Sequence, residues 1–120
     1  MLKILQLLRA SRSVKTFKVL DFKQGRDFYY LRLEAVLTTG EVLYIREYVS
    51  TSGRMYSYHW QDRRGTLICR WDNAPHYKEL KTFPYHKHTP KGVEESLETD
   101  LEDVLREIEK TLGPELRAKD

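Results

Sequence analysis

Apolar and polar residues alternate along most of the first 72 positions of the chain. From Val14 to Asp72, β-branched and aromatic residues are frequent and apolar side chains recur at about every second position. This spacing is typical of strands that bury one face. Turn residues divide the stretch into five expected strands, over 14–22, 27–37, 41–50, 54–61 and 66–72. Because short turns join them, the pattern predicts an antiparallel meander.

Helical spacing appears at both ends of the chain. Leu2 to Ala10 predicts a short N-terminal helix. Near the C-terminus, apolar residues recur three or four positions apart, at Leu97, Leu101, Val104, Leu105, Ile108 and Leu112. Thr99 and Glu102 match a capping box, and Gly113-Pro114 is a stop signal. The expected fold is therefore α+β, one domain over 1–120: a meander of about five strands with a short N-terminal helix and a C-terminal amphipathic helix packed on it.

The hairpin turn at 62–65 determines which side chains share a face. If Gln61 opposes Thr66, Trp60 opposes Leu67 and the two faces follow by alternation. One face carries Tyr56, Tyr58, Trp60, Leu67, Cys69 and Trp71; the other carries Ser57, His59, Gln61, Ile68, Arg70 and Asp72. The aromatic face is expected to be core. The alternative is an exposed platform on which RNA bases stack.

Charge is distributed unevenly along the 120 residues, whose net charge is +3. Residues 1–91 hold 17 Lys and Arg against 8 Asp and Glu, whereas residues 92–120 hold 4 against 10. A basic body suits nucleic acid. The acidic end either screens that body, binds a basic partner, or is only a solvated surface. With one cysteine, no leader-like start and no apolar run of membrane length, the chain is expected to be cytoplasmic and not bound to a membrane.

All four histidines lie between residues 59 and 88, where most of the candidate chemistry is concentrated. Histidine exchanges protons near neutral pH, and no Gly-rich nucleotide loop or cysteine-containing metal cluster accompanies it. This favours RNA cleavage by acid and base catalysis, without metal or cofactor. The candidate catalytic residues are His59, His76, His86, His88, Arg70, Lys87 and Asp72; the candidate RNA-binding residues are Tyr58, Trp60, Asn73, Tyr85, Arg63 and Arg64. The segment from Asn73 to Lys91 is expected to be irregular and to return over the polar face of the sheet.

Several of these residues have a second interpretation. His86 and His88 have the spacing of a metal-binding pair. Asp72 and Asn73, close to Pro75, can equally be turn residues. Glu47 interrupts an apolar row and is expected either at an edge or buried and paired. Pro84 either stiffens its loop or follows a cis peptide bond.

The segments 58–62, 70–76 and 82–88 resemble the TumE family of prokaryotic toxins from type II toxin–antitoxin systems. They read Tyr-His-Trp-Gln-Asp, Arg-Trp-Asp-Asn-Ala-Pro-His and Thr-Phe-Pro-Tyr-His-Lys-His. The resemblance extends from the strand at Val14 through the C-terminal helix. It implies toxicity and a co-encoded antitoxin, usually predicted to carry a helix-turn-helix. Many members have histidine where this chain has Tyr77 and Tyr85, which makes those positions poor candidates for obligatory catalysis.

The resemblance does not supply a mechanism, so two functions remain in competition. One is a toxin ribonuclease with RNA as its substrate. The other is a non-catalytic module that inhibits a nucleic acid or a protein by binding to it. Formation of a homo-oligomer is compatible with both functions.

Overall fold

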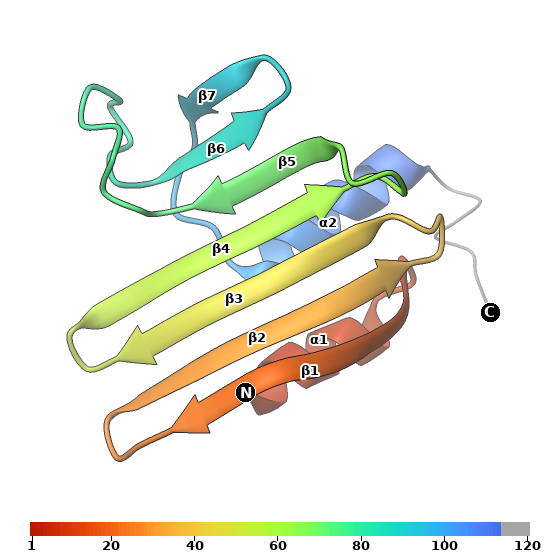
Figure 1. Cartoon of the computed structure of the whole chain (residues 1–120), viewed down its shortest axis with the longest axis horizontal. Helices are drawn as coiled ribbons and strands as arrows, with labels where there is room; N and C mark the ends of the chain where they lie inside the picture. The colour runs from red at the N-terminus through yellow and green to blue at the C-terminus, as the bar shows by residue number, and fades with distance from the viewer. Residues whose placement is uncertain (114–120) are drawn as a thin grey trace.

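The computed structural model describes residues 1–113, and its main element is one antiparallel sheet in which the strands follow in sequence order (Figure 1). The seven strands are β1 (Val14–Gln24), β2 (Phe28–Leu37), β3 (Val42–Ser50), β4 (Gly53–Gln61), β5 (Leu67–Asp72), β6 (His86–Thr89) and β7 (Gly92–Glu95). The first five agree with the predicted meander within two residues at each end. The predicted α+β class is therefore confirmed.

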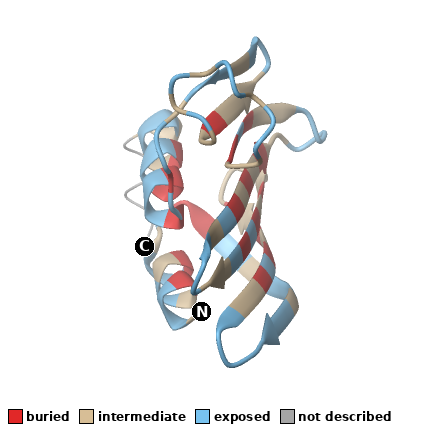
Figure 2. Ribbon diagram, turned by 90° about the vertical axis from the view of Figure 1, so that its left-hand side faces the viewer, coloured by how far each residue is buried: buried red, intermediate tan, exposed pale blue. Residues whose placement is uncertain are grey.

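Two helices lie on the same side of this sheet, α1 (Leu2–Ala10) and α2 (Leu101–Leu112) (Figure 2). We call this side the covered face and the opposite side the open face. On the covered face, side chains from alternate strand positions pack against the apolar sides of both helices. The buried residues include Ile4, Leu8, Leu31, Leu33, Leu43, Ile45, Tyr58, Val104, Leu105 and Ile108. Neither of the helices described is long and apolar enough to cross a membrane.

The start of α2 differs by one residue from the predicted cap. Asp100 is the N-cap: its carboxylate accepts from the backbone N–H of Asp103, and the Asp103 carboxylate accepts from the N–H of Asp100. The predicted Thr99–Glu102 box is therefore wrong. Thr99 is buried, and its backbone N–H donates to the hydroxyl of Tyr56. The helix ends at Gly113, as predicted, with a φ of 89° that favours glycine; Pro114 lies outside the described residues.

The pairing of β4 with β5 contains an extra residue that simple alternation did not reveal. Gln61 pairs with Leu67 rather than Thr66, and after an irregularity Trp60 pairs with Cys69. Ile68, predicted on the polar face, packs against the core instead. Leu67, predicted on the aromatic face, pairs with Gln61 and so lies on the polar face. Beyond this bulge the alternation resumes, and the other members of both sets keep their predicted faces.

The predicted irregular segment 73–91 is wrong in its second half. Residues 73–85 are irregular, and β6 and β7, joined by a turn at residues 90–91, extend the sheet beyond β5. Each of these strands has four residues, too few for alternation to be recognised beside prolines. The peptide bond between Phe83 and Pro84 is cis.

Candidate functional site

Three neighbouring strands place two histidines and an arginine in one row on the open face. His59 of β4 pairs with Arg70 of β5, which pairs in turn with His88 of β6. Because neighbouring strands lie about 5 Å apart, the two histidine backbones are separated by about 10 Å, with Arg70 between them. The next row along the same strands contains Ser57, Asp72 and His86.

Asp72 is the centre of the polar contacts in this region. Its side chain is almost fully buried, at 7% exposed. Oδ1 lies 2.8 Å from Nε2 of His86, and Oδ2 lies 3.2 Å from Nε2 of His88 and 3.4 Å from Nε of Arg70. Oδ1 also accepts from the backbone N–H of Ala74 at 3.0 Å. The carboxylate therefore fixes the positions of three side chains and of the loop that follows β5.

His86 is the most buried member of the group, at 1% exposed. Its Nδ1 lies 3.0 Å from the carbonyl oxygen of Pro84, and its Nε2 faces Asp72. Both ring nitrogens thus face acceptors, although a neutral imidazole has one N–H. Tyr77 lies edge-on to both neighbouring histidines, with ring centroids 4.8 Å from His86 and 5.8 Å from His88.

His59 and His88 have the more accessible rings, and in each ring one nitrogen contacts a neighbouring side chain. Nε2 of His59 contacts Oε1 of Gln61 at 3.1 Å, and Nε2 of His88 contacts Asp72. If each neutral histidine carries its proton on Nε2, that nitrogen donates the hydrogen bond to Gln61 or to Asp72. Nδ1 of the same ring then has the lone pair that can take a proton. Burial, and then the charge of Arg70, lower the pKa of His59 from 6.5. Burial also lowers the pKa of His88, and the carboxylate of Asp72 opposes that shift.

Arg70 gives the row its positive charge. Its side chain is 45% exposed, and within residues 1–113 it forms an ion pair with Asp72 through Nε. A guanidinium has five N–H donors in a planar fork that matches phosphate oxygens. The exposed part of the group can therefore bind an anion between the two histidines.

Two of the candidate catalytic residues lie outside this cluster. Lys87 alternates with His86 and His88, so it lies on the covered face, where it lines a depression with Trp60, Trp71 and residues of α2. His76 is exposed in the loop, and within residues 1–113 no side-chain contact joins it to the row. Lys87 thus lies on the opposite face of the sheet from Arg70, and a catalytic role of His76 stays a prediction.

The candidate RNA-binding residues are also divided between the two faces. Tyr58 and Trp60 are buried under the helices, at 0% and 4% exposed, which confirms the core interpretation of the aromatic face. Tyr85 packs at the margin of the core. The side chain of Asn73 joins the backbones of Arg54 and Tyr56, so this residue has a structural role. Arg63 and Arg64 are exposed in the β4–β5 turn.

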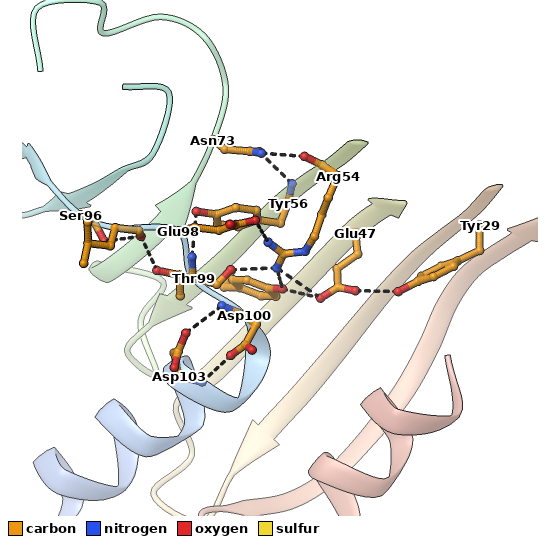
Figure 3. A network of polar contacts seen from close by, with 12 residues as sticks. Tyr29, Glu47, Arg54, Tyr56, Asn73, Ser96, Glu98, Thr99, Asp100 and Asp103 are labelled. Atoms are coloured by element: carbon orange, nitrogen blue, oxygen red, sulfur yellow. Dashed lines mark hydrogen bonds and ion pairs between the residues drawn. The ribbon is translucent and has the colours of Figure 1, made fainter. Parts of the chain in front are cut away.

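A second buried carboxylate lies on the covered face, within the network in Figure 3. Glu47 is 4% exposed and accepts hydrogen bonds from the hydroxyls of Tyr29, at 3.1 Å, and of Tyr58. Burial, and then the charge of Glu47, raise the pKa of Tyr29 to about 12; the same causes raise the pKa of Tyr58 further. Arg54 donates to Tyr58 at 2.6 Å and to the carbonyl of Thr99 at 2.8 Å. Glu47 is thus buried and paired, and its network fixes the chain that leads into α2.

Sequence reasoning missed the residues that cover the rest of the open face. They come from β2 and β3 and include Phe28, Tyr30, Arg32, Glu34, Tyr44, Arg46 and Tyr48. Their signal was present in the sequence, because they alternate with the buried row that includes Leu31, Leu33, Leu43 and Ile45. The polar half of that alternation contains arginine and tyrosine.

Asp72, His86 and His88 are also the described residues best arranged to hold a metal ion. One donor atom from each lies within 4.8 Å of the others, and the contact of His86 Nδ1 with the Pro84 carbonyl would orient Nε2 as a ligand. Two imidazoles and a carboxylate suit zinc or a similar ion. The guanidinium of Arg70 beside the same carboxylate opposes cation binding.

Comparison with known proteins identifies one family. The model of the family described as Toxin TumE matches residues 4–112, which includes most of α1, every strand and the whole of α2. Comparisons with curated proteins and with solved structures give no match. A match of this extent supports a toxin role, and a toxin family in general implies an antitoxin partner. The chain belongs to the TumE toxin family.

Proposed function

We propose that this toxin is a metal-independent ribonuclease of the cytoplasm, with His59 and His88 as acid and base and Arg70 as the phosphate-binding group. The observation that carries the proposal is the row of His59, Arg70 and His88 across β4, β5 and β6. An anion on Arg70 has an imidazole on either side. The partner would be a co-encoded antitoxin, with a helix-turn-helix as the resemblance implies.

The different surroundings of the two histidines suggest which proton each one moves. His88 is backed by Asp72, which stabilises the imidazolium that forms when His88 takes a proton. We therefore assign His88 as the base that removes the proton from the 2'-hydroxyl. His59 lies beside Arg70 and, within residues 1–113, has no carboxylate among its contacts, so its protonated form gives up a proton readily. We assign it as the acid.

The reaction follows from these roles. The 2'-oxygen attacks phosphorus as His88 takes its proton, the bond from phosphorus to the 5'-oxygen breaks, and His59 protonates that oxygen. The products are a 2',3'-cyclic phosphate and a free 5'-hydroxyl. Arg70 neutralises the charge that accumulates on the phosphorane oxygens. His86 and Asp72 are positioning residues in this scheme, because they hold His88.

Cleavage of single-stranded RNA by the purified chain tests the proposal. His59→Ala and His88→Ala are expected to lower the rate by about 10² to 10⁴, the usual contribution of a general acid or base. His76→Ala is the matched control, because this histidine lies outside the row, and its rate should equal that of the unaltered chain. Melting curves of all three variants should confirm that they remain folded.

Two results would replace the proposal with another function. Activity lost in EDTA and restored by zinc would assign Asp72, His86 and His88 to a metal site. Undiminished toxicity of both His59→Ala and His88→Ala would indicate the non-catalytic module that acts by binding. Cleavage that persists in EDTA and leaves cyclic phosphate ends supports the ribonuclease.

A further inference from the structure

The open face has a hollow beside the histidine row, on the side toward β2 and β3. It has a volume of about 270 Å³, and its lining includes Tyr30, Arg46, Tyr48, Ser57, Arg70 and Asp72. A second depression shares Arg46, Ser57 and Arg70 with it and continues to Arg32, Tyr44 and His59. The two hollows form one continuous surface that ends at the proposed cleavage site.

Two arginines face each other in the middle of this surface. Arg32 of β2 and Arg46 of β3 are cross-strand partners, and like charges placed directly opposite destabilise a sheet. Within the described part of the chain neither arginine forms an ion pair, although Arg46 lies 5.8 Å from the ring centroid of Tyr30. An anion bound between the two guanidiniums would relieve the repulsion.

Aromatic rings lie next to these arginines. Phe28 and Tyr48 stack at 5.7 Å and remain 37% and 40% exposed, and Met55 beside them is 58% exposed. Apolar and aromatic surface of this kind on a sheet, next to cationic groups, is typical of sites where unpaired bases stack while their phosphates are bound. Duplex RNA has no base face to offer such rings, because its bases stack on one another.

We propose that the open face binds single-stranded RNA, with a phosphate on Arg32 and Arg46 and an unpaired base in the hollow against Tyr30 and Tyr48. This inference rests on the proposed ribonuclease function and names the form of its substrate. The strand continues from the hollow to Arg70, so the base lies beside the phosphate that is cleaved. The positive charge of Arg32, Arg46 and Arg70 complements the charge of the strand.

The test measures binding of a fluorescent 2'-O-methyl RNA strand, which keeps its bases and phosphates but has no 2'-hydroxyl to be attacked. We expect Tyr48→Ala to weaken binding at least about fivefold, from the usual strength of base stacking, and Tyr48→Phe to keep it. Arg46→Gln should weaken binding and lower the slope of log affinity against log salt by about 0.7. Arg9→Gln, at an exposed position of α1 on the other side of the sheet, should leave the affinity unchanged. The duplex of the same sequence should bind more weakly than the single strand.

Failure of this inference can be told apart from failure of the nuclease. If RNA is cleaved but Tyr48→Ala and Arg46→Gln bind the strand as tightly as the unaltered chain, the surface proposed here is wrong. If the same two variants lose antitoxin binding and keep RNA binding, the face belongs to the protein partner and the inference is also wrong. If the variants bind RNA as expected but the unaltered chain cleaves none, the binding surface is supported and the ribonuclease proposal is wrong.

Discussion

The chain buries two carboxylates, one on each face of its sheet, and their partners differ. Glu47 on the covered face is 4% exposed and contacts two tyrosine hydroxyls and Arg54. Asp72 on the open face has a side chain that is 7% exposed, and it contacts two histidines and Arg70. Burial alone therefore does not separate a carboxylate that only stabilises the fold from one at a proposed site. Two partners of Asp72, His88 and Arg70, have side chains that are 26% and 45% exposed on the open face, whereas Glu47 is bound by Arg54 and by two tyrosine hydroxyls whose pKa burial raises.

The largest effect is expected where the covered face itself is broken. Leu105 of α2 is buried, and Leu105→Asp would leave a charge without a partner among apolar side chains. Loss of the leucine alone costs about 2 to 5 kcal/mol, so we expect the chain to unfold or α2 to detach, which circular dichroism and a melting curve will show. Arg106→Gln on the exposed side of the same helix should change stability by less than about 0.5 kcal/mol. An unchanged melting temperature for Leu105→Asp would contradict the packing described.

The next largest effect is expected at Glu47, the buried carboxylate of the covered face. Glu47→Ala leaves Arg54 and two tyrosine hydroxyls without their buried acceptor, and we expect the free energy of unfolding to fall by about 3 to 5 kcal/mol, measured by urea denaturation. Glu34→Ala is the matched control, because this glutamate lies on the open face and pairs with the exposed Lys18 at 3.4 Å. It should cost no more than about 1 kcal/mol. Equal losses in the two variants would show that the network in Figure 3 adds nothing.

For the second carboxylate the expected effect is on rate rather than on folding. Asp72→Asn removes a charged hydrogen bond to His88, worth about 1.5 to 3 kcal/mol, so cleavage should slow by roughly ten- to a hundredfold. Asp72 raises the pKa of His88; its removal should move the acidic limb of the pH–rate profile to lower pH. Arg70 lowers the pKa of both histidines, and Arg70→Gln should move the same limb to higher pH. An acidic limb that stays in place in both variants would show that His88 is not the base that titrates there.

The smallest effect is expected for the acidic side chains on the exposed side of α2. Glu102 and Glu107 are about half exposed on α2. Replacing both by glutamine should raise nonspecific RNA affinity a few-fold, or alter antitoxin binding, at low salt, and the change should fade above about 0.1 M salt because of screening. If neither affinity changes at low salt, α2 serves only to cover the sheet.

Alternation was sufficient to predict most of the sheet and the role of its aromatic face, because a buried face requires an apolar side chain at every second position. It did not predict the bulge beside Gln61, since one extra residue leaves the pattern on either side intact. Lys87 shows a different error. A metal-binding pair of His86 and His88 requires both side chains on one face, and in an extended segment the lysine between them then lies on the other face.

The sequence predicts that Asp72, His86 and His88 lie in one region, but it does not predict the contacts between them. The sequence placed these residues in or beside an irregular loop, and a loop does not define pairs. It is the pairing of β6 with β5 that brings them within hydrogen-bonding distance. Strands of four residues depend on their neighbours more than on their own sequence, so this pairing was not visible in the pattern.

The order of the strands also has a consequence for how the chain folds. Each strand pairs with the next along the chain, so most of the sheet can form hairpin by hairpin while synthesis continues, without long loops to close. The row of His59, Arg70 and His88 needs β4, β5 and β6 together. A ribosome-bound chain therefore remains without its complete row until residue 88 has emerged from the ribosome.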